Sequence, residues 1–332
     1  MQFEHVVPRA RVLGTGSYVP ETIRSNEDLE ATFDTTATWI TSRTGILRRR
    51  IAAEGETTSD MATAASRRAI EAAGLTVADL DLIIVATSTG DAPLPATAVY
   101  LQQKLGADLI PAFDVNASST GFLYALCMAD QFVGVGTYNT VLVVGADCPS
   151  RALGPDDRTG AVLFGDGAGA VVLGPTRDER GILSARIHAD GCLSDLMRIP
   201  GGGSAEPMTE EALAQGRHFL ELDGPALGRV TVKHLTSTSM MALKAARLTS
   251  AELDWVIPLQ ANLKIVTTIS DRLGFPLERF VLNLAEYGNT MAASVPIALD
   301  EGIRDGRVAS GHTVLMCALG AGVTWGAMMM RV

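Results

Sequence analysis

Three hydroxyl-bearing residues, Ser118, Ser119 and Thr120, lie between an apolar segment and an amphipathic helical pattern in the run AFDVNASSTGFLYALCMA at 112–129. The order of strand, small residues and helix predicts a tight strand-to-helix turn, a position suited to a nucleophile. Backbone N–H groups and the macrodipole at the start of a helix favour developing negative charge there. The same residues could instead only cap the helix, as serine and threonine often do. From spacing alone, both interpretations stay open.

Two segments of the chain recur at the same distance, which indicates an internal duplication. LTVADLDLIIVATST begins at residue 75 and returns as LTSAELDWVIPLQAN at residue 248, an offset of 248 − 75 = 173. NTVLVVGADC begins at residue 139 and returns as HTVLMCALGAG at residue 312, an offset of 312 − 139 = 173. We therefore predict two duplicated halves, at 1–175 and 176–332.

In each half an alanine-rich helical pattern precedes an apolar run of strand length. This alternation predicts an α/β fold with a mainly parallel sheet that is covered on both faces. Ligands of such sheets bind beyond the carboxyl ends of the strands. The residues that follow the apolar runs are small or polar, as a binding site requires: Ser88, Ser119, Gln260, Asn262 and Asn289.

The chain has 332 residues, of which 47% are hydrophobic, and a formal charge of -10. This composition fits a globular protein with a large core, and the acidic balance argues against a nucleic-acid or anionic-membrane partner. No stretch approaches the ~18 consecutive apolar residues of a membrane helix, and the first residues lack a signal-peptide pattern. The four cysteines show no metal-ligand spacing. We expect a cytoplasmic protein with no metal and no nucleic-acid or membrane partner.

The run that contains Ser119 resembles the nucleophile elbow of the ketoacyl-ACP synthases III, a family with the pattern Asp-x-x-x-x-Cys-x-Gly-Phe. Asp114, Gly121 and Phe122 place Ser119 at the cysteine. Further segments that resemble the family follow along the chain: VLGTGSYVPE, WITSRTGILRRRIA, LFGDGAGAVVLG, HADG, YGNTMAASVPIALDEGIRDGR and GAGVTWG. The resemblance implies a thiolase-like five-layer αβαβα fold and a homodimer. It also implies acyl-CoA as the substrate, no other cofactor, and an acyl carrier protein as a further candidate partner.

The family's catalytic set is cysteine, histidine and asparagine, and the resemblance implies that only the asparagine is kept, as Asn289. Leu259 in WVIPLQAN takes the position of the histidine. In the family, the histidine and the asparagine stabilise the enolate that forms when a malonyl thioester loses carbon dioxide. Losing one such donor costs on the order of 10²–10³ in rate, so we expect decarboxylative condensation to be weak.

A serine hydroxyl is a poorer nucleophile than a thiol at neutral pH, so Ser119 needs a general base or assistance from a helix dipole. We predict that His188 is this base and that Asp190, or another carboxylate, orients it as in a Ser-His-Asp arrangement. The alternative is that the HADG segment is structural, as it is in cysteine-containing members. The daunorubicin-type priming ketosynthases resemble this chain in carrying serine at the nucleophile position, which favours a working serine.

The resemblance also assigns the donor site. Trp39, Arg43 and Arg158 match residues that hold the adenine and phosphates of coenzyme A by stacking and charge. Asn262 matches a residue that contacts the pantetheine arm. These residues would form the mouth of a tunnel for acyl-CoA.

Gly320 and Gly322 correspond to the family's glycine-rich turn, whose backbone N–H groups complete the oxyanion hole together with that of Ser119. Leu94 lies where the family's dimer partner inserts a phenylalanine into the acyl pocket, and we place Leu259 and Leu319 in the same pocket. Leucine at position 94 predicts a pocket of different shape, suited to a larger or branched acyl group.

From these residues we predict an acyltransferase that takes an acyl group from acyl-CoA, or from an acyl carrier protein, onto Ser119. It would pass this group to an acceptor in polyketide or other specialised biosynthesis. One alternative is a decarboxylative ketoacyl-ACP synthase III in which serine has been put in place of the cysteine, although Leu259 argues against it. The other is a catalytically silent partner subunit of the same fold, which would have no need for the CoA-binding residues.

Overall fold

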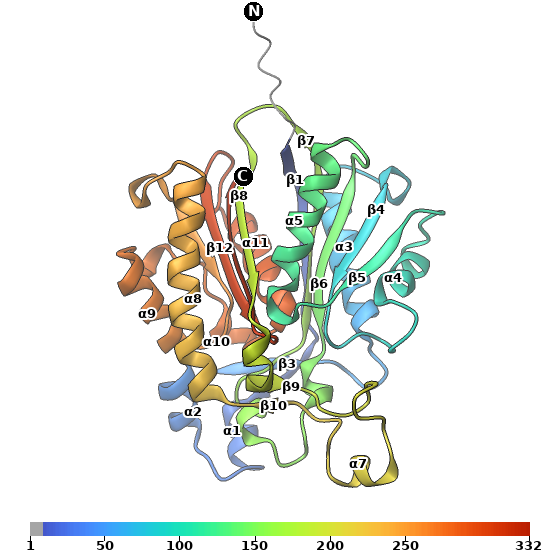
Figure 1. Ribbon diagram of the computed structural model, residues 1–332, viewed down its shortest axis with the longest axis vertical. Helices are drawn as coiled ribbons and strands as arrows, with labels where there is room; N and C mark the ends of the chain where they lie inside the picture. The colour runs from blue at the N-terminus through green and yellow to red at the C-terminus, as the bar shows by residue number, and fades with distance from the viewer. Residues whose placement is uncertain (1–8) are drawn as a thin grey trace, which may run out of the picture.

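Residues 9–332 of the chain, as the computed structural model describes them, form two β-sheets packed with helices (Figure 1). The first sheet has the order β1 (Arg9–Tyr18), β7 (Gly167–Thr176), β6 (Val141–Asp147), β4 (Leu82–Ala86) and β5 (Ala112–Val115). The second has the order β11 (Trp255–Pro258), β12 (Thr313–Gly320), β13 (Thr324–Arg331) and β8 (Gly181–Ala189). Two short ribbons pair β2 (Thr22–Ser25) with β3 (Arg48–Ile51), and β9 (Met197–Arg198) with β10 (Glu221–Leu222).

The longer helices form three layers around these sheets. Helices α3 (Thr58–Ala72) and α4 (Thr97–Leu105) pack on the outer face of the first sheet. Helices α5 (Gly121–Gly134) and α11 (Ser294–Arg304) lie between the two sheets. Helices α8 (Gly224–Ala245) and α9 (Leu263–Leu273) cover the outer face of the second sheet. The predicted five-layer αβαβα fold is therefore confirmed.

Short helices lie in the connections: α1 (Asn26–Glu30), α2 (Ala37–Thr44), α6 (Arg158–Ala161), α7 (Glu210–Ala214) and α10 (Leu284–Tyr287). Single turns of 3₁₀-helix, η2 (Ser118–Thr120) and η7 (Met291–Ala293), precede α5 and α11. Across the described range 9–332, no helix combines the length and apolar character needed to cross a membrane.

The apolar runs form strands that are buried on both faces, as the layers require. In β6, Val141 and Val143 pack against the helices between the sheets, whereas Leu142 and Val144 pack against α3 and α4. A strand covered on both sides has no solvent face, so it reads as a continuous apolar run rather than an alternating one.

The prediction of mainly parallel sheets is wrong. The pairs β4–β5, β4–β6 and β11–β12 are parallel, but β1–β7, β6–β7, β12–β13 and β13–β8 are antiparallel. Only a short turn, at 321–323, separates β12 from β13, and a connection of that length can join only antiparallel neighbours.

The two repeated segments form equivalent strand pairs. Leu82 in β4 pairs with Val141 in β6, and Trp255 in β11 pairs with Val314 in β12. Both residues of the second pair lie 173 positions after their counterparts, since 255 − 82 = 173 and 314 − 141 = 173. The proposed division at 175/176 falls at the end of β7, the last strand of the first sheet.

A buried carboxylate fastens the loops at the ends of the strands. Asp147, at the end of β6, is 0% exposed. Its Oδ1 accepts hydrogen bonds from Thr87, Ser88 and Thr89, which follow β4. Its Oδ2 accepts from the backbone N–H of Ala292 in η7 at 2.9 Å. One side chain thus joins the loop after β4 to the segment that precedes α11.

Replacing Asp147 by asparagine should lower the free energy of unfolding by about 2–3 kcal/mol, because an amide NH₂ in place of Oδ2 would face the Ala292 N–H and leave it unpaired. Urea unfolding measures the loss. The control is Asp305→Asn, since that more exposed carboxylate accepts from Arg307 two residues away. A loss for Asp147→Asn no larger than for the control would contradict the assigned role.

Candidate active site

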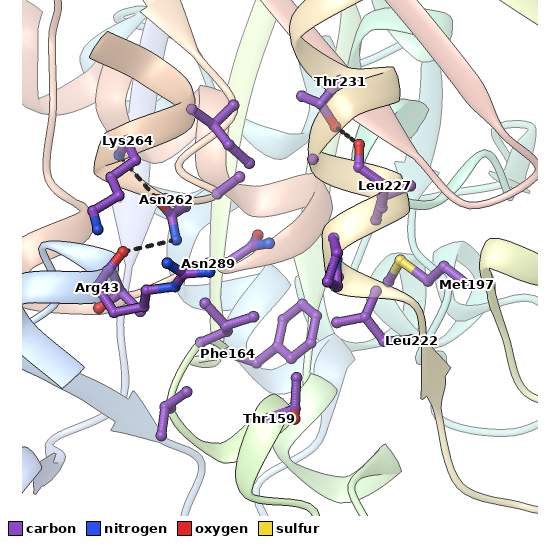
Figure 2. A pocket seen from close by; sticks show the side chains of 18 of the residues that line it. Arg43, Thr159, Phe164, Met197, Leu222, Leu227, Thr231, Asn262, Lys264 and Asn289 are labelled. Atoms are coloured by element: carbon purple, nitrogen blue, oxygen red, sulfur yellow. Dashed lines mark hydrogen bonds between the residues drawn. The ribbon is translucent and has the colours of Figure 1, made fainter. Parts of the chain in front are cut away.

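A cavity of about 390 Å³ lies where strands of both sheets end. It brings together eight of the residues singled out from the sequence: Trp39, Arg43, Ser119, Arg158, Leu259, Asn262, Asn289 and Leu319. The other residues assigned to the site from the family resemblance do not line it: Leu94, His188, Gly320 and Gly322. The rest of the wall is mainly apolar and includes Phe164, Met197, Leu222 and Leu227, which Figure 2 shows facing the same space as Asn289.

Ser119 lies in a strained turn at the start of α5. It is 3% exposed and belongs to η2, directly before that helix. The preceding residue, Ser118, has φ 49°, in the left-handed region that non-glycine residues rarely adopt. Thr324 anchors the turn from the second sheet: its carbonyl accepts from the Thr120 hydroxyl, and its own hydroxyl donates to the Ala117 carbonyl. The turn is thereby fixed against both sheets.

Asn289 presents an oriented amide to the cavity. Its Oδ1 accepts from the backbone N–H of Met291 at 2.9 Å. Its backbone forms a parallel bridge with Phe164 of the cavity wall. With Oδ1 engaged, Nδ2 is the group left to donate into the cavity.

Leu259 gives the inner wall an apolar surface where the family has a histidine. It is 5% exposed, and its N–H donates to the Cys317 carbonyl at 2.7 Å at the end of β11. Among the described residues that line the cavity there is no histidine, aspartate or glutamate. Ser119 therefore shares this cavity with no imidazole or carboxylate, among the described residues, that could act as a general base.

His188 does not meet Ser119, and the prediction of a Ser-His-Asp arrangement finds no support. In β8, His188 is opposite Trp325, and the two rings stack with centroids 5.4 Å apart. The Trp325 indole N–H donates to Thr238, so the Trp325 side chain points toward α8. The next residue, Gly326, faces the other way: a Cβ atom there would lie 3.6 Å from the Thr120 side chain. Because side chains alternate along a strand, His188 faces α8, on the opposite side of the sheet from Thr120.

The HADG segment instead supports the glycine-rich turn. The backbone of Asp190 exchanges two hydrogen bonds with Val323, and its carboxylate accepts from the N–H of Cys192. A Cβ atom at Gly320 would lie 2.7 Å from the Ser119 nitrogen, and Gly322 has φ 127°. Both positions therefore require glycine. Their backbone role in an oxyanion hole stays a prediction.

The mouth of the cavity is aromatic and basic. Trp39 in α2 is 44% exposed, and the Arg158 guanidinium lies 5.4 Å from its ring centre. Asn262 caps α9 by accepting from the N–H of Lys264, and its Nδ2 donates to the Arg43 carbonyl at 3.3 Å (Figure 2). Lys264 also lines the cavity, so three cations surround its mouth. Sequence reasoning missed Lys264, although it follows Asn262 by only two residues.

Leu94 lies outside this cavity and is 85% exposed. It belongs to the loop between β4 and α4. An exposed leucine is suited to contact with a second copy, and its role in an acyl pocket stays a prediction.

Two family models match the chain: 3-oxoacyl-[acyl-carrier-protein (ACP)] synthase III over residues 113–191, and 3-oxoacyl-[acyl-carrier-protein (ACP)] synthase III C terminal over residues 243–332. The β-ketoacyl-[acyl-carrier-protein] synthase III of Laribacter hongkongensis is 45% identical over 98% of this chain and 100% of its own length. That of Clostridioides difficile is 43% identical over 97% of this chain and 98% of its own length.

Solved structures of similar fold come from the same family of synthases and from related ketosynthases. The 3-oxoacyl-[acyl-carrier-protein] synthase III of Aquifex aeolicus has a TM-score of 0.90 and 40% identity, with 97% of this chain and 100% of that chain covered. The priming β-ketosynthase of the R1128 polyketide pathway has a TM-score of 0.91 and 35% identity, with 98% and 96% covered. Since the likeness extends over nearly the whole length of these proteins, the chain belongs to the 3-oxoacyl-[acyl-carrier-protein] synthase III family.

Proposed function

We propose that this chain transfers an acyl group from a thioester donor to an acceptor through an ester on Ser119. The observation that carries the proposal is that Ser119 and Asn289 line one cavity of about 390 Å³ whose mouth carries Trp39, Arg43 and Arg158. A half-exposed tryptophan beside arginines suits the adenine and phosphates of CoA. An apolar cavity of this size suits the thioester arm behind them.

In the first step, Ser119 Oγ would attack the thioester carbonyl, the C–S bond would break, and the hydroxyl proton would end on the leaving thiolate. Proton transfer to the leaving group matters because the described lining residues include no histidine or carboxylate that could act as a general base. The Ser119 N–H at the start of α5, together with the adjacent glycine turn, would stabilise the developing oxyanion.

For the second step, the names of the relatives favour the condensing alternative over transfer within polyketide biosynthesis. The acceptor would then be a malonyl thioester on an acyl carrier protein. Its loss of carbon dioxide would give an enolate that attacks the Ser119 ester. This attack would expel the serine as an alkoxide, which takes a proton from water, and would leave a β-ketoacyl thioester. Asn289 Nδ2 would donate to the enolate oxygen, whereas Leu259 cannot donate, so this step should be slow.

Leu259 favours a second candidate, transfer to a hydroxyl, amine or thiol acceptor, because such transfer needs no enolate. The structural likeness to a priming β-ketosynthase supports the narrower proposal of a priming role. The assignment to a daunorubicin-type subclass rests on Ser119 alone. A silent partner subunit is less well supported, since an aromatic and basic cavity mouth would serve no purpose in it.

We further propose a homodimer in which Leu94 of each copy contacts the other. The exposed position of this leucine supports the proposal. The acyl carrier protein would be a transient partner at the cavity mouth, where Arg43, Arg158 and Lys264 could meet an acidic carrier.

Incubation with a panel of acyl-CoAs should add the mass of one acyl group to the intact protein. Ser119→Ala should abolish this adduct, because the oxygen that accepts the acyl group is removed. The matched control is Ser118→Gly, which removes the neighbouring hydroxyl and suits its left-handed backbone, and should keep the adduct. An unaltered chain that gains no mass with any donor would exclude the covalent route.

Leu259→His should raise the rate of carbon dioxide release from a malonyl thioester about 10²-fold, since it restores a second donor to the enolate. Radiolabelled malonyl-carrier substrate measures the release. Leu222→His adds an imidazole elsewhere on the same wall and should leave the rate unchanged. If the two variants behave alike, Leu259 does not occupy the enolate-stabilising position.

Trp39→Ala should raise the KM for acyl-CoA about tenfold by removing the stacking surface. It should leave the KM for a short acyl thioester without the nucleotide unchanged, since only the nucleotide reaches the mouth. Steady-state kinetics with both donors measure the two KM values. An equal rise in KM for the two donors would mean that Trp39 does not stack on the adenine.

A further inference from the structure

Arg49 is the largest fully buried side chain described, with 0% exposure in β3. Its Nη1 donates to the Arg24 carbonyl at 3.0 Å, and its Nη2 donates to Asn26 Oδ1 at 2.9 Å and to the Val162 carbonyl at 3.1 Å. These partners are all neutral oxygens. Removing a cation from water without pairing it to a carboxylate is costly, so the guanidinium is not explained by packing.

The charge of Arg49 persists at neutral pH. Burial, and after it the neighbouring Arg24, lower the pKa of Arg49 to about 10. The guanidinium therefore stays protonated, and its bonds are charge-assisted and fixed by a planar fork.

One branch of this fork leads to the cavity mouth. Asn26, which accepts from Arg49, uses its Nδ2 to donate to Thr41 Oγ1 at 3.0 Å. Thr41 lies in α2 between Trp39 and Arg43. Asn26 thus joins Arg49 to the helix that carries two of the proposed donor-binding residues.

The bond from Arg49 to Val162 connects the guanidinium to the backbone of Asn289. Val162, which accepts from Arg49, precedes Leu163, and the Leu163 carbonyl accepts from the Asn289 N–H at 2.8 Å. The Gly165 N–H in turn donates to the Asn289 carbonyl at 3.1 Å. The segment that Arg49 holds is therefore the one that fixes the backbone of Asn289.

The aliphatic stem of Arg49 supports the same bridge. A Cβ atom at Gly165 would lie 3.0 Å from the Arg49 Cβ, and one at Gly288 would lie 3.5 Å from it. Gly165 follows Phe164 and Gly288 precedes Asn289, so these glycines flank the backbone bridge between Phe164 and Asn289. Strand β3 therefore runs close beside both segments of the bridge at Arg49.

We propose that Arg49 is a positioning residue that couples the donor-binding helix α2 to Asn289, by holding Asn26 on one side and the Val162 carbonyl on the other. Ordering of α2 by a bound donor would then fix the 162–165 wall and the amide of Asn289 before the acyl group is transferred. The catalytic part of this inference rests on the proposed function, but the coupling itself does not.

The test compares the full chain with Arg49→Met, which keeps much of the stem but loses the fork, and Arg49→Lys, which keeps the charge and reaches fewer partners. The control is Arg304→Met, whose arginine donates to Asp300 and to the Thr15 carbonyl, away from the cavity. Hydrogen–deuterium exchange is measured on each protein without ligand and with CoA, and CoA affinity is measured by calorimetry.

In the unaltered chain and in Arg304→Met, CoA should slow exchange both in 37–44 and at the amides of Gly165 and Asn289. In Arg49→Met, the same two amides should exchange at least tenfold faster and gain no protection from CoA, and CoA affinity should fall about tenfold. Arg49→Lys should give exchange rates and a CoA affinity between those of Arg49→Met and the unaltered chain. If Arg49→Met does not fold, the comparison of Arg49→Lys with the unaltered chain tests the proposal by itself. Unchanged exchange at Gly165 and Asn289 in both variants would overturn the proposal.

Acylation kinetics separate this inference from the proposed function. If Ser119 is acylated, Arg49→Lys should raise the KM for the acyl donor and slow carbon dioxide release from a malonyl thioester, the step assigned to Asn289, whereas Arg304→Met should change neither. If no protein acylates but the exchange pattern holds, the proposed function fails and the coupling stands. Carbon dioxide release at an equal rate in Arg49→Lys and in the unaltered chain would show that the coupling does not act on the Asn289 amide.

Discussion

The close contact between the Ser119 turn and the end of β12 is the constraint on which the site depends. A Cβ atom at Gly320 would lie 2.7 Å from the Ser119 nitrogen and 2.8 Å from the Ala117 carbonyl, so the backbones meet with no room for a side chain. Such an approach needs sheets held at a fixed spacing. Helices α5 and α11 set that spacing, since both fill the layer between the sheets. Asn289 then reaches the same cavity from the segment that leads into α11.

The site separates its charges from the atoms expected to react. Arg43, Arg158 and Lys264 line the mouth, whereas the inner wall near Ser119 holds Leu259 and other apolar side chains with a single oriented amide. In such a low-dielectric interior, each remaining dipole acts more strongly than it would in water. As the proposed nucleophile, Ser119 would depend on backbone N–H groups and the helix terminus, so the geometry of its turn would matter more than it would for a thiolate.

Features that depend on local sequence could be predicted, and features set by tertiary packing could not. The repeat at 173 predicted duplicated halves, and the strand pairs β4–β6 and β11–β12 are equivalent because repeated segments fold into the same elements. The Ser119 turn could be found because strand, small residues and helix follow one another. His188 was misplaced because its side chain faces α8, a consequence of β8 being paired with β13. The burial of Arg49 could not be predicted, since nothing in the run RRR at 48–50 reveals which arginine is buried.

One inner helix covers a sheet to which it does not belong. Helix α11, late in the chain, packs against the first sheet, and its Asp300 accepts hydrogen bonds from Thr15 and Ser17 of β1. Asp147 of the first sheet holds the N–H of Ala292. The halves of this chain are therefore not exchangeable modules: a chimera with a relative has to match the side chains across α5 and α11, even if it is joined at the largely exposed connection between β7 and β8.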